Sequence, residues 1–424
     1  MFKKGLLQAV YLRLAGETPG EGALQFVRNL KLIGVSFAFA KVVSALVSVA
    51  AGRLLGPEEF GRISVVVSAG AALALFIVGG LKNAVVRYGA DARDRDAVFT
   101  AGAAAFLALA AAVSALTLLF GGGLSAFFGI TPRMLDLALF YALALGLYTI
   151  ATAFQQGAGN FSARGGSEVL FSLIMAAVFF ALAGRFSLGY EAMAWAYIAA
   201  FGSTGLFWFV RSLRGIRPAF PEKKKASEMA WYGFYFFGSG TAHFLMVNVQ
   251  ALLLNHLLPQ REVGVYAAYY TASIGVASYL GHAIGTVLFH KASASTNRAR
   301  LWDLAVRGWL RLAPAAIALF LAAETGVLGL MGRHQYGLNP WTALLFAAAA
   351  TAILIFTSLA DIVYSEGVRA LRFSLFLTWG GGLLNLAACL LLAPRFGAAA
   401  AAVSTILSYG AMTLLLRKAK TAYL

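Results

Sequence analysis

The chain has 424 residues, of which 60% are hydrophobic and only 12% are charged, and its mean hydropathy is +0.78. This composition excludes a soluble enzyme with one membrane anchor and predicts a protein that crosses the membrane many times. The formal net charge is +17. Because the basic residues lie between apolar segments, we interpret the charge as a signature of membrane topology and of membrane lipid as a partner, with no nucleic acid.

The apolar pattern predicts twelve helices of membrane-spanning length. In chain order they cover residues 32–54, 60–81, 97–120, 135–156, 169–186, 190–210, 230–258, 263–289, 304–323, 341–363, 373–393 and 398–416. Runs of alanine and glycine inside them favour close packing of helices. We therefore expect an all-α polytopic fold.

Most of the 34 Lys and Arg residues fall in alternate loops, which the positive-inside rule assigns to the cytoplasm. Both termini are then predicted to be cytoplasmic. The first apolar segment is too long for a signal peptide, so we expect no cleaved leader. The single cysteine, Cys389, offers neither a disulfide framework nor a thiolate metal site.

A short internal repeat pairs residues 54–61 (LLGPEEFG) with residues 257–264 (LLPQREVG). Six predicted spans lie on each side of a basic central stretch, so the two halves have the same orientation. We predict a cytoplasmic or interfacial segment 1–31, an N-lobe 32–210, a basic linker 211–228, a C-lobe 229–416 and a cytoplasmic tail 417–424. The two six-helix lobes are expected to be pseudo-symmetric.

Lys41 is the most informative single residue, because it lies inside the first apolar segment. Its depth is roughly 14 Å, close to the midplane of a hydrocarbon core about 30 Å thick. An ammonium group at that depth is costly, and Gly34, Ser44 and Ser48 share its predicted helix face. We hypothesise that Lys41 binds cargo or couples transport; the alternative is a lysine held in a helix interface by a carboxylate or carbonyl group.

The repeat places either His243 or Phe244 opposite Lys41, depending on whether the prolines or the leucine pairs are aligned. His243 is a second candidate for cargo binding, with a hydrogen-bonded core histidine as the alternative. Arg311, in the ninth predicted span, is a third candidate for a cavity residue. Asn248 can hydrogen-bond sugars or join helices.

Two further charged residues lie near the predicted cytoplasmic ends of spans. Lys82 either binds an anionic headgroup or follows the topology rule. Asp361 is a candidate coupling or gating group, and its alternative role is an ion pair with Arg369 or Arg372. The sequence contains no phosphate-binding loop, zinc signature or nucleophile elbow, so we predict neither an enzyme nor a bound cofactor.

Residues 52–61 (GRLLGPEEFG) and 81–88 (LKNAVVRY), separated by an apolar span, resemble the opening of bacterial polysaccharide-exporting flippases. These flippases belong to the multidrug/oligosaccharidyl-lipid/polysaccharide exporter superfamily. The twelve spans, the basic linker and residues 394–397 (PRFG) extend the resemblance along the chain.

The resemblance implies two lobes around a central cavity that opens alternately to each side of the bacterial inner membrane. The implied cargo is an undecaprenyl-pyrophosphate-linked oligosaccharide, moved from the cytoplasmic to the outer leaflet, with H⁺ or Na⁺ as a possible coupling ion. Lys41, His243 and Arg311 would supply the cationic cavity. Two alternatives stay open: a drug or cation antiporter of the related branch, and a membrane glycosyltransferase or polymerase acting on the same lipid carrier.

Overall fold

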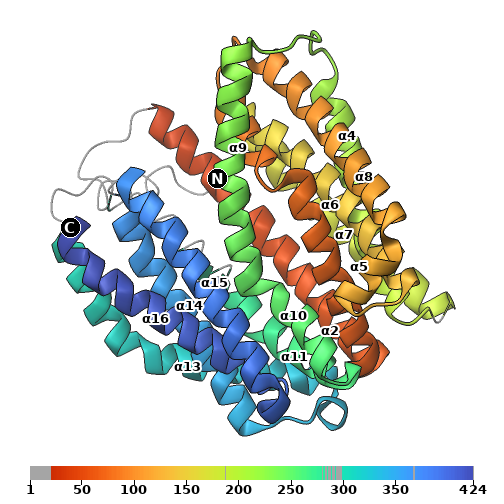
Figure 1. Ribbon diagram of the computed structural model, residues 1–424, viewed down its shortest axis with the longest axis vertical. Coiled ribbons are helices and arrows are strands. Elements are labelled where there is room, and N and C mark those ends of the chain that lie inside the picture. The colour runs from red at the N-terminus through yellow and green to blue at the C-terminus, as the bar shows by residue number, and fades with distance from the viewer. Residues whose placement is uncertain are drawn as a thin grey trace, which may run out of the picture.

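The computed structural model describes residues 21–186, 188–278, 280–281, 284, 288, 292, 298–365 and 368–423, and within these ranges the side chains from residue 34 onward except those of residues 185, 186, 368, 369, 371, 419 and 421–423. Within this part of the chain every regular element is an α-helix, and the helices form two bundles (Figure 1). The N-lobe contains α2 (Glu21–Val78), α3 (Leu81–Gly89), α4 (Arg95–Leu119), α5 (Gly121–Phe128), α6 (Pro132–Gly157), α7 (Phe161–Phe186) and α8 (Tyr190–Leu213). The C-lobe contains α9 (Lys223–Val247), α10 (Val249–Leu257), α11 (Gln260–Ala272), α13 (Arg298–Tyr336), α14 (Pro340–Tyr364), α15 (Val368–Phe396) and α16 (Ala399–Tyr423).

The helices account for the predicted membrane segments in order. Nine described helices are long and apolar enough to cross a membrane, and α9 with α10, bent by 42°, makes a tenth. Helix α2 holds two predicted segments, because the chain turns at Gly56 (φ 75°) before Pro57 and then continues as a helix. The eighth segment, 263–289, begins as α11, and most of its remainder lies outside the described residues. The all-α polytopic prediction is confirmed.

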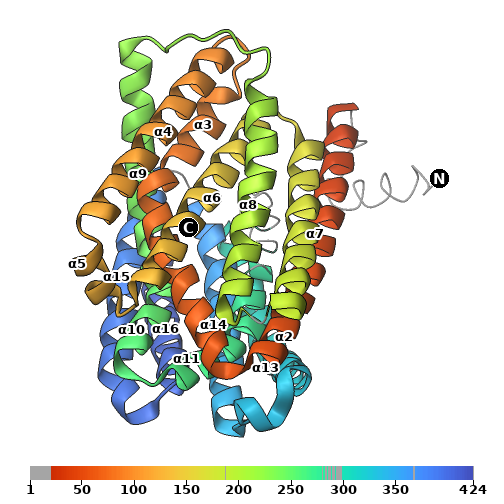
Figure 2. The same cartoon turned by 90° about the vertical axis from the view of Figure 1, so that its right-hand side faces the viewer.

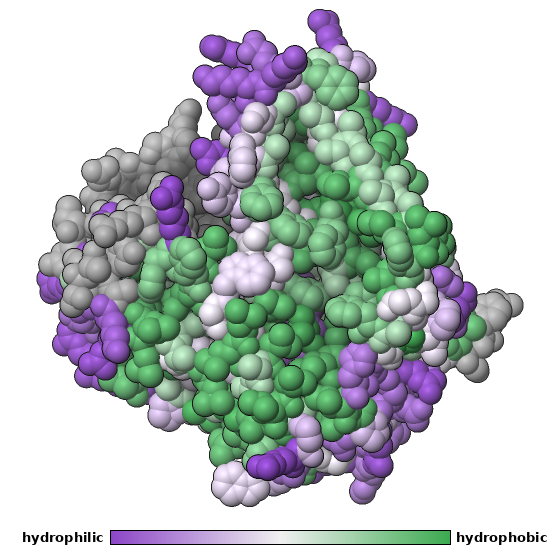
Figure 3. Space-filling view, in the orientation of Figure 1, coloured by the Kyte–Doolittle hydropathy of each residue, from purple (hydrophilic) through white to green (hydrophobic). Residues whose placement is uncertain are grey.

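Apolar side chains cover the middle of the molecule, and hydrophilic ones gather toward its two ends (Figure 3). This distribution is typical of a protein whose middle contacts lipid hydrocarbon. The chain between α8 and α9 connects the lobes at one end, which we call the linker end and which the topology rule assigns to the cytoplasm (Figure 2). We call the opposite end the far end.

Several helices extend beyond the predicted spans, among them α7, α9, α13 and α16. Helix α7 begins at Phe161 instead of residue 169, and α13 continues to Tyr336 instead of ending at residue 323. Asn160 starts α7 by accepting a hydrogen bond from the backbone N–H of Ala163 (3.1 Å), which satisfies one of the free amide groups of the first turn. A hydropathy window ends at charged residues, whereas a helix does not, so Arg164, Glu168 and Glu324 lie inside long helices.

The two lobes begin equivalent helices with the same local device. A glycine with positive φ (Gly129, 64°; Gly337, 57°) is followed two residues later by an N-cap residue and then by proline. The N-caps are Thr131, which accepts from the N–H of Met134, and Asn339, whose side chain accepts from the N–H groups of Trp341 and Thr342. Proline suits the first helical position because it has no N–H to satisfy. The sequences GITP and GLNP are thus a second trace of the duplication, one that the sequence analysis did not identify.

The first repeat motifs contact one another across the lobe interface, where α2 packs against α11. A Cβ atom added to Gly61 would clash with the carbonyl oxygen of Gln260, and one added to Gly264 would clash with that of Pro57. These contacts are reciprocal, as a pseudo-two-fold axis requires. Gly61 thus corresponds to Gly264, and Pro57 to Gln260, with the same separation along the sequence in both pairs. Applied to Lys41, this separation gives Phe244, so the contacts decide between the two registers that the sequence left open.

Further bonds close the far end between the lobes. The hydroxyl of Tyr336 on α13 donates to the carbonyl of Gly52 on α2 (2.7 Å), and the amide of Asn255 on α10 donates to the carbonyl of Gly129 (2.7 Å). At the linker end the contact runs through α3 and α9, where Gly80 lies against Gly233. The two lobes are therefore in contact across the far end, and at the linker end they are in contact on one side, through α3 and α9.

One buried amide group joins several helices of the C-lobe. The Nε2 of Gln250 on α10 lies 2.9–3.1 Å from four acceptors, on Asn385 of α15 and on Ala401, Ser404 and Thr405 of α16. Its Oε1 accepts from the hydroxyl of Tyr266 (3.3 Å). Gln250 thus joins helices.

We expect Gly264→Ala to destabilise this state of the protein, because the added methyl group overlaps the Pro57 carbonyl at the lobe interface. Overpacking of this kind costs about 1–3 kcal/mol. The measurement is the apparent unfolding temperature in detergent, with Gly308→Ala as the matched control, since a Cβ at Gly308 meets no atom within 4 Å. Equal unfolding temperatures for the two variants would contradict the close approach of the repeat motifs.

Candidate substrate-binding site

A cluster of charged and aromatic side chains lies inside the N-lobe near its linker end. Arg164 and Glu168, one turn apart on α7, form an ion pair of 2.7 Å, with side chains 14% and 11% exposed. The hydroxyl of Tyr148 on α6 donates to the same Glu168 oxygen (2.8 Å). The Arg164 guanidinium also lies 4.8 Å from the ring centroid of Phe37 on α2. Three helices therefore fix one arginine in position.

Lys82 adds a second positive charge to this cluster. It is half-buried at the start of α3, just beyond the second membrane span. Burial and the nearby Arg164 guanidinium lower the pKa of Lys82 below the usual lysine value, while Glu168 acts in the opposite sense. The cluster therefore holds two cationic groups and one carboxylate in partial isolation from water.

Lys41 lies on the α2 face that looks toward this cluster. It follows Phe37 by four residues, which places both side chains on the same side of the helix. Lys41 is half-buried, and the first half of α2 packs against α7. In Figure 2 this part of α2, in red, lies beside α7 at the edge of the N-lobe. The structure thus brings two of the predicted residues, Lys41 and Lys82, to one side of the N-lobe.

The other predicted site residues lie on the C-lobe helices. His243 is exposed on α9, and Asn248 is the half-buried residue at the bend between α9 and α10. Arg311 is exposed on α13 between the exposed side chains of Leu310 and Leu312. Asp361 is half-buried on α14, and the described residues contain no ion pair between it and Arg372; the Arg369 side chain lies outside them.

Sequence reasoning missed three polar residues of the spans. Arg164 was assigned to a cytoplasmic loop, and Glu168 was placed one residue before the fifth span. Their four-residue spacing is a helical ion-pair pattern that could have indicated an earlier helix start. Glu324 on α13 is fully buried, and neither carboxylate oxygen has a hydrogen-bond partner among the described residues. It directly follows the predicted end of the ninth span.

We expect Glu168→Gln to destabilise the protein more than Glu58→Gln. Both glutamates pair with an arginine four residues away, but the Glu58 side chain is 60% exposed and that of Glu168 only 11%. Removing one partner of a buried pair leaves an uncompensated charge and costs about 3 kcal/mol, whereas an exposed pair contributes less than about 1 kcal/mol. Denaturant or thermal unfolding in detergent measures the difference; similar losses would show that the Arg164–Glu168 pair is effectively solvated.

Comparison with known proteins places the fold. The chain is similar to the lipid II flippase MurJ in an inward closed conformation, with a TM-score of 0.69 and 14% identity over 92% of this chain and 87% of that chain. It is also similar to a multidrug resistance MATE family transporter of the MOP superfamily in an inward-facing conformation, with a TM-score of 0.58 and 15% identity over 90% and 95% of the two chains. It is similar as well to an outward-facing conformation of a multidrug resistance MATE family transporter of the MOP superfamily, with a TM-score of 0.53 and 16% identity over 93% of this chain and 96% of that chain. At these identities the likeness establishes the fold.

No curated protein matches the chain in sequence. The model of a family described as polysaccharide biosynthesis protein matches residues 50–336. That match begins in the first span, includes the opening motif, and ends in α13. Because it covers more than half of the chain, this multi-pass membrane protein belongs to the polysaccharide biosynthesis protein family.

Proposed function

We propose that this protein moves an undecaprenyl-pyrophosphate-linked oligosaccharide from the cytoplasmic to the outer leaflet of the bacterial inner membrane. The observation that carries the proposal is the cationic cluster of Lys82 and Arg164, with Lys41 on the adjoining face of α2. The family and the fold support the same conclusion, because lipid-linked sugars are precursors of polysaccharides and the fold is that of a flippase and of transporters.

The charge of the cluster favours an anionic cargo. A pyrophosphate group must lose much of its hydration to cross the membrane, and charge-assisted hydrogen bonds from ammonium and guanidinium groups replace that hydration. The single carboxylate, Glu168, is already bound by Arg164 and Tyr148. An organic cation would meet net positive charge here, which argues against the drug antiporter alternative.

We propose that the path between the lobes opens at the linker end in this state, beside the contact between α3 and α9. The far end is closed by the reciprocal glycine contacts and by the Tyr336 and Asn255 bonds. The cluster lies nearer the linker end, where a cytoplasmic headgroup would arrive. In the proposed cycle the lobes rock about their interface, so that the far-end contacts break when the linker end closes. No covalent bond of the cargo changes.

We infer that Glu324 carries the coupling proton, in preference to Asp361. Glu324 is fully buried on α13, whereas Asp361 is half-buried. An ionised carboxyl group without a partner is costly in such a place, so it takes up a proton or a cation. Ser273 of α11 faces it, but that hydroxyl donates to the carbonyl of Tyr269 (2.8 Å). Tyr269 of α11 is a titratable neighbour of Glu324. A metal cation prefers more oxygen ligands than the described residues place around Glu324, which favours a proton.

We expect Lys41→Ala and Lys82→Ala to reduce flipping by at least about tenfold, because each removes a charge-assisted hydrogen bond to the pyrophosphate. The measurement is the translocation of a fluorescent lipid-linked oligosaccharide in proteoliposomes. Lys223→Ala, at the exposed start of α9, is the control and should flip at the wild-type rate. Wild-type flipping rates for both Lys41→Ala and Lys82→Ala would refute the proposed binding site. Uptake of organic cations, or polymerisation of the glycan by the purified protein, would refute the proposed cargo.

We expect Glu324→Gln to retain flipping without a gradient but to lose its stimulation by a transmembrane pH gradient. Glutamine keeps the volume of the neutral acid but cannot release a proton. Glu228→Gln, exposed on α9, serves as the control and should keep the stimulation. If Glu324→Gln responds to the pH gradient as the wild type does, the coupling assignment is wrong even though the flipping assay succeeds. Stimulation by a sodium gradient alone would also overturn it.

A further inference from the structure

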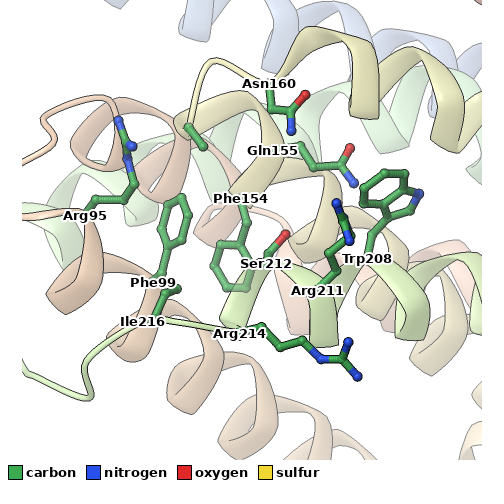
Figure 4. Close-up of a pocket in the computed structure, with 11 residues that line it drawn as sticks. Arg95, Phe99, Phe154, Gln155, Asn160, Trp208, Arg211, Ser212, Arg214 and Ile216 are labelled. Atoms are coloured by element: carbon green, nitrogen blue, oxygen red, sulfur yellow. The ribbon is translucent and has the colours of Figure 1, made fainter.

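A pocket of about 410 Å³ lies in the N-lobe at the linker end, between α4, α6 and α8 (Figure 4). It is lined by residues of these three helices and of the two loops beside them, and it is separate from the Lys82–Arg164 cluster. The lining residues are Arg95, Phe99, Phe154, Gln155, Ala158, Asn160, Trp208, Arg211, Ser212, Arg214 and Ile216. Three of them are arginines, and none of these described residues is acidic.

Two nitrogen donors in this pocket are buried without an acceptor among the described residues. They are Nε2 of Gln155 and Nε1 of Trp208. Gln155 is only 3% exposed, and the hydroxyl of Ser167 lies 3.0 Å from its Oε1 atom and 2.8 Å from the carbonyl oxygen of Ala163. A buried N–H group without an acceptor is destabilising by about 1–3 kcal/mol, so the pocket is suited to a ligand that supplies oxygen atoms.

The arginines are available for the same ligand. The Nε of Arg95 donates to the carbonyl of Gly89 (3.1 Å). This bond orients the guanidinium group and leaves its terminal nitrogens available to a ligand. Arg211 and Arg214 are exposed and belong to no ion pair of the described residues. In Figure 4 the guanidinium of Arg211 lies with Gln155 and Trp208, and Arg95 lies across the pocket beyond Phe99. A cation beside unpaired donors is a feature of a phosphate site, and Figure 4 shows this combination at Arg211, while the Arg214 side chain points away from Gln155 and Trp208.

The surroundings of the pocket favour a phosphate carried by a lipid. Phe99, Phe154 and Ile216 supply an apolar lining beside the arginines. On α8, Phe207 and Val210 are exposed next to Trp208 and Arg211, so the pocket adjoins a surface suited to acyl chains. Basic pockets between transmembrane helices on the cytoplasmic side bind anionic headgroups.

We propose that this pocket binds the phosphate headgroup of an anionic membrane lipid, at a position away from the path between the lobes. The bound phosphate would accept from Gln155, Trp208 and Arg211. Since Gln155 is joined through Ser167 to the helix that carries Glu168, the lipid stabilises the α6–α7 pair that fixes Arg164. The expected consequence is that anionic lipid stabilises the folded protein independently of any cargo.

Native mass spectrometry of the intact protein tests the proposal, with phosphatidylglycerol or phosphatidylethanolamine added to the detergent solution. We expect phosphatidylglycerol to bind preferentially and to raise the unfolding temperature. The double variant Arg211→Gln/Arg214→Gln should lower its apparent affinity by about tenfold or more, since bonds to charged groups contribute that much. Arg217→Gln, an exposed linker arginine outside the pocket, should leave binding unchanged.

A second variant separates binding from folding. Gln155→Leu removes the unpaired donor with little change of volume, so it should weaken phosphatidylglycerol binding while the lipid-free protein stays folded. Equal binding of the two lipids would overturn the proposal, as would equal losses in the double variant and in Arg217→Gln. If inorganic phosphate alone gives the same stabilisation as the lipid, the ligand is a soluble phosphate and the lipid assignment is wrong.

Discussion

The close approach of α2 and α11 is the constraint on which the arrangement of the two lobes depends. Glycine at positions 61 and 264 allows backbone to meet backbone, and each glycine contacts the partner motif in the same way. In lipid, helices gain little from burying apolar surface, so association depends on close packing and polar contacts. A small-residue contact of this kind is also readily broken and remade, which a lobe interface that must rock requires.

Charge inside the bundle follows a second rule, which is that each ionised group has a partner or a task. Arg164 is held by Glu168, Tyr148 and Phe37, so its position is fixed before any ligand arrives. Lys82 belongs to no ion pair among the described residues, and the carboxylate that acts on it is Glu168, the partner of Arg164. Preorganised charge lowers the cost of binding because little reorganisation is needed. The C-lobe contains Glu324, whose buried carboxylate has no hydrogen-bond partner within the part of the chain that the structure describes.

Much of the fold could be predicted from hydropathy alone, because membrane-spanning length and the positive-inside rule act on whole segments. The site could be predicted only in part. Lys41 and Lys82 stood out because they interrupt or end apolar runs, but Arg164 and Glu168 were read as loop residues. Their partner Tyr148 lies on another helix, so no local pattern records the pairing. The register that aligns Lys41 with Phe244 likewise required the contact between Gly61 and Gly264 in space.

The hydrogen bond between Ser167 and Gln155 relates the two polar regions of the N-lobe. On α6, Tyr148 and Gln155 are two turns apart and so lie on one face, toward α7. On α7, Ser167 and Glu168 are adjacent; Ser167 bonds to Gln155, and Glu168 bonds to Tyr148. A displacement of α7 relative to α6 would therefore disturb the lipid pocket and the cationic cluster together. If occupancy of one region displaces α7 relative to α6, it changes the geometry of the other region, and that coupling is then reciprocal.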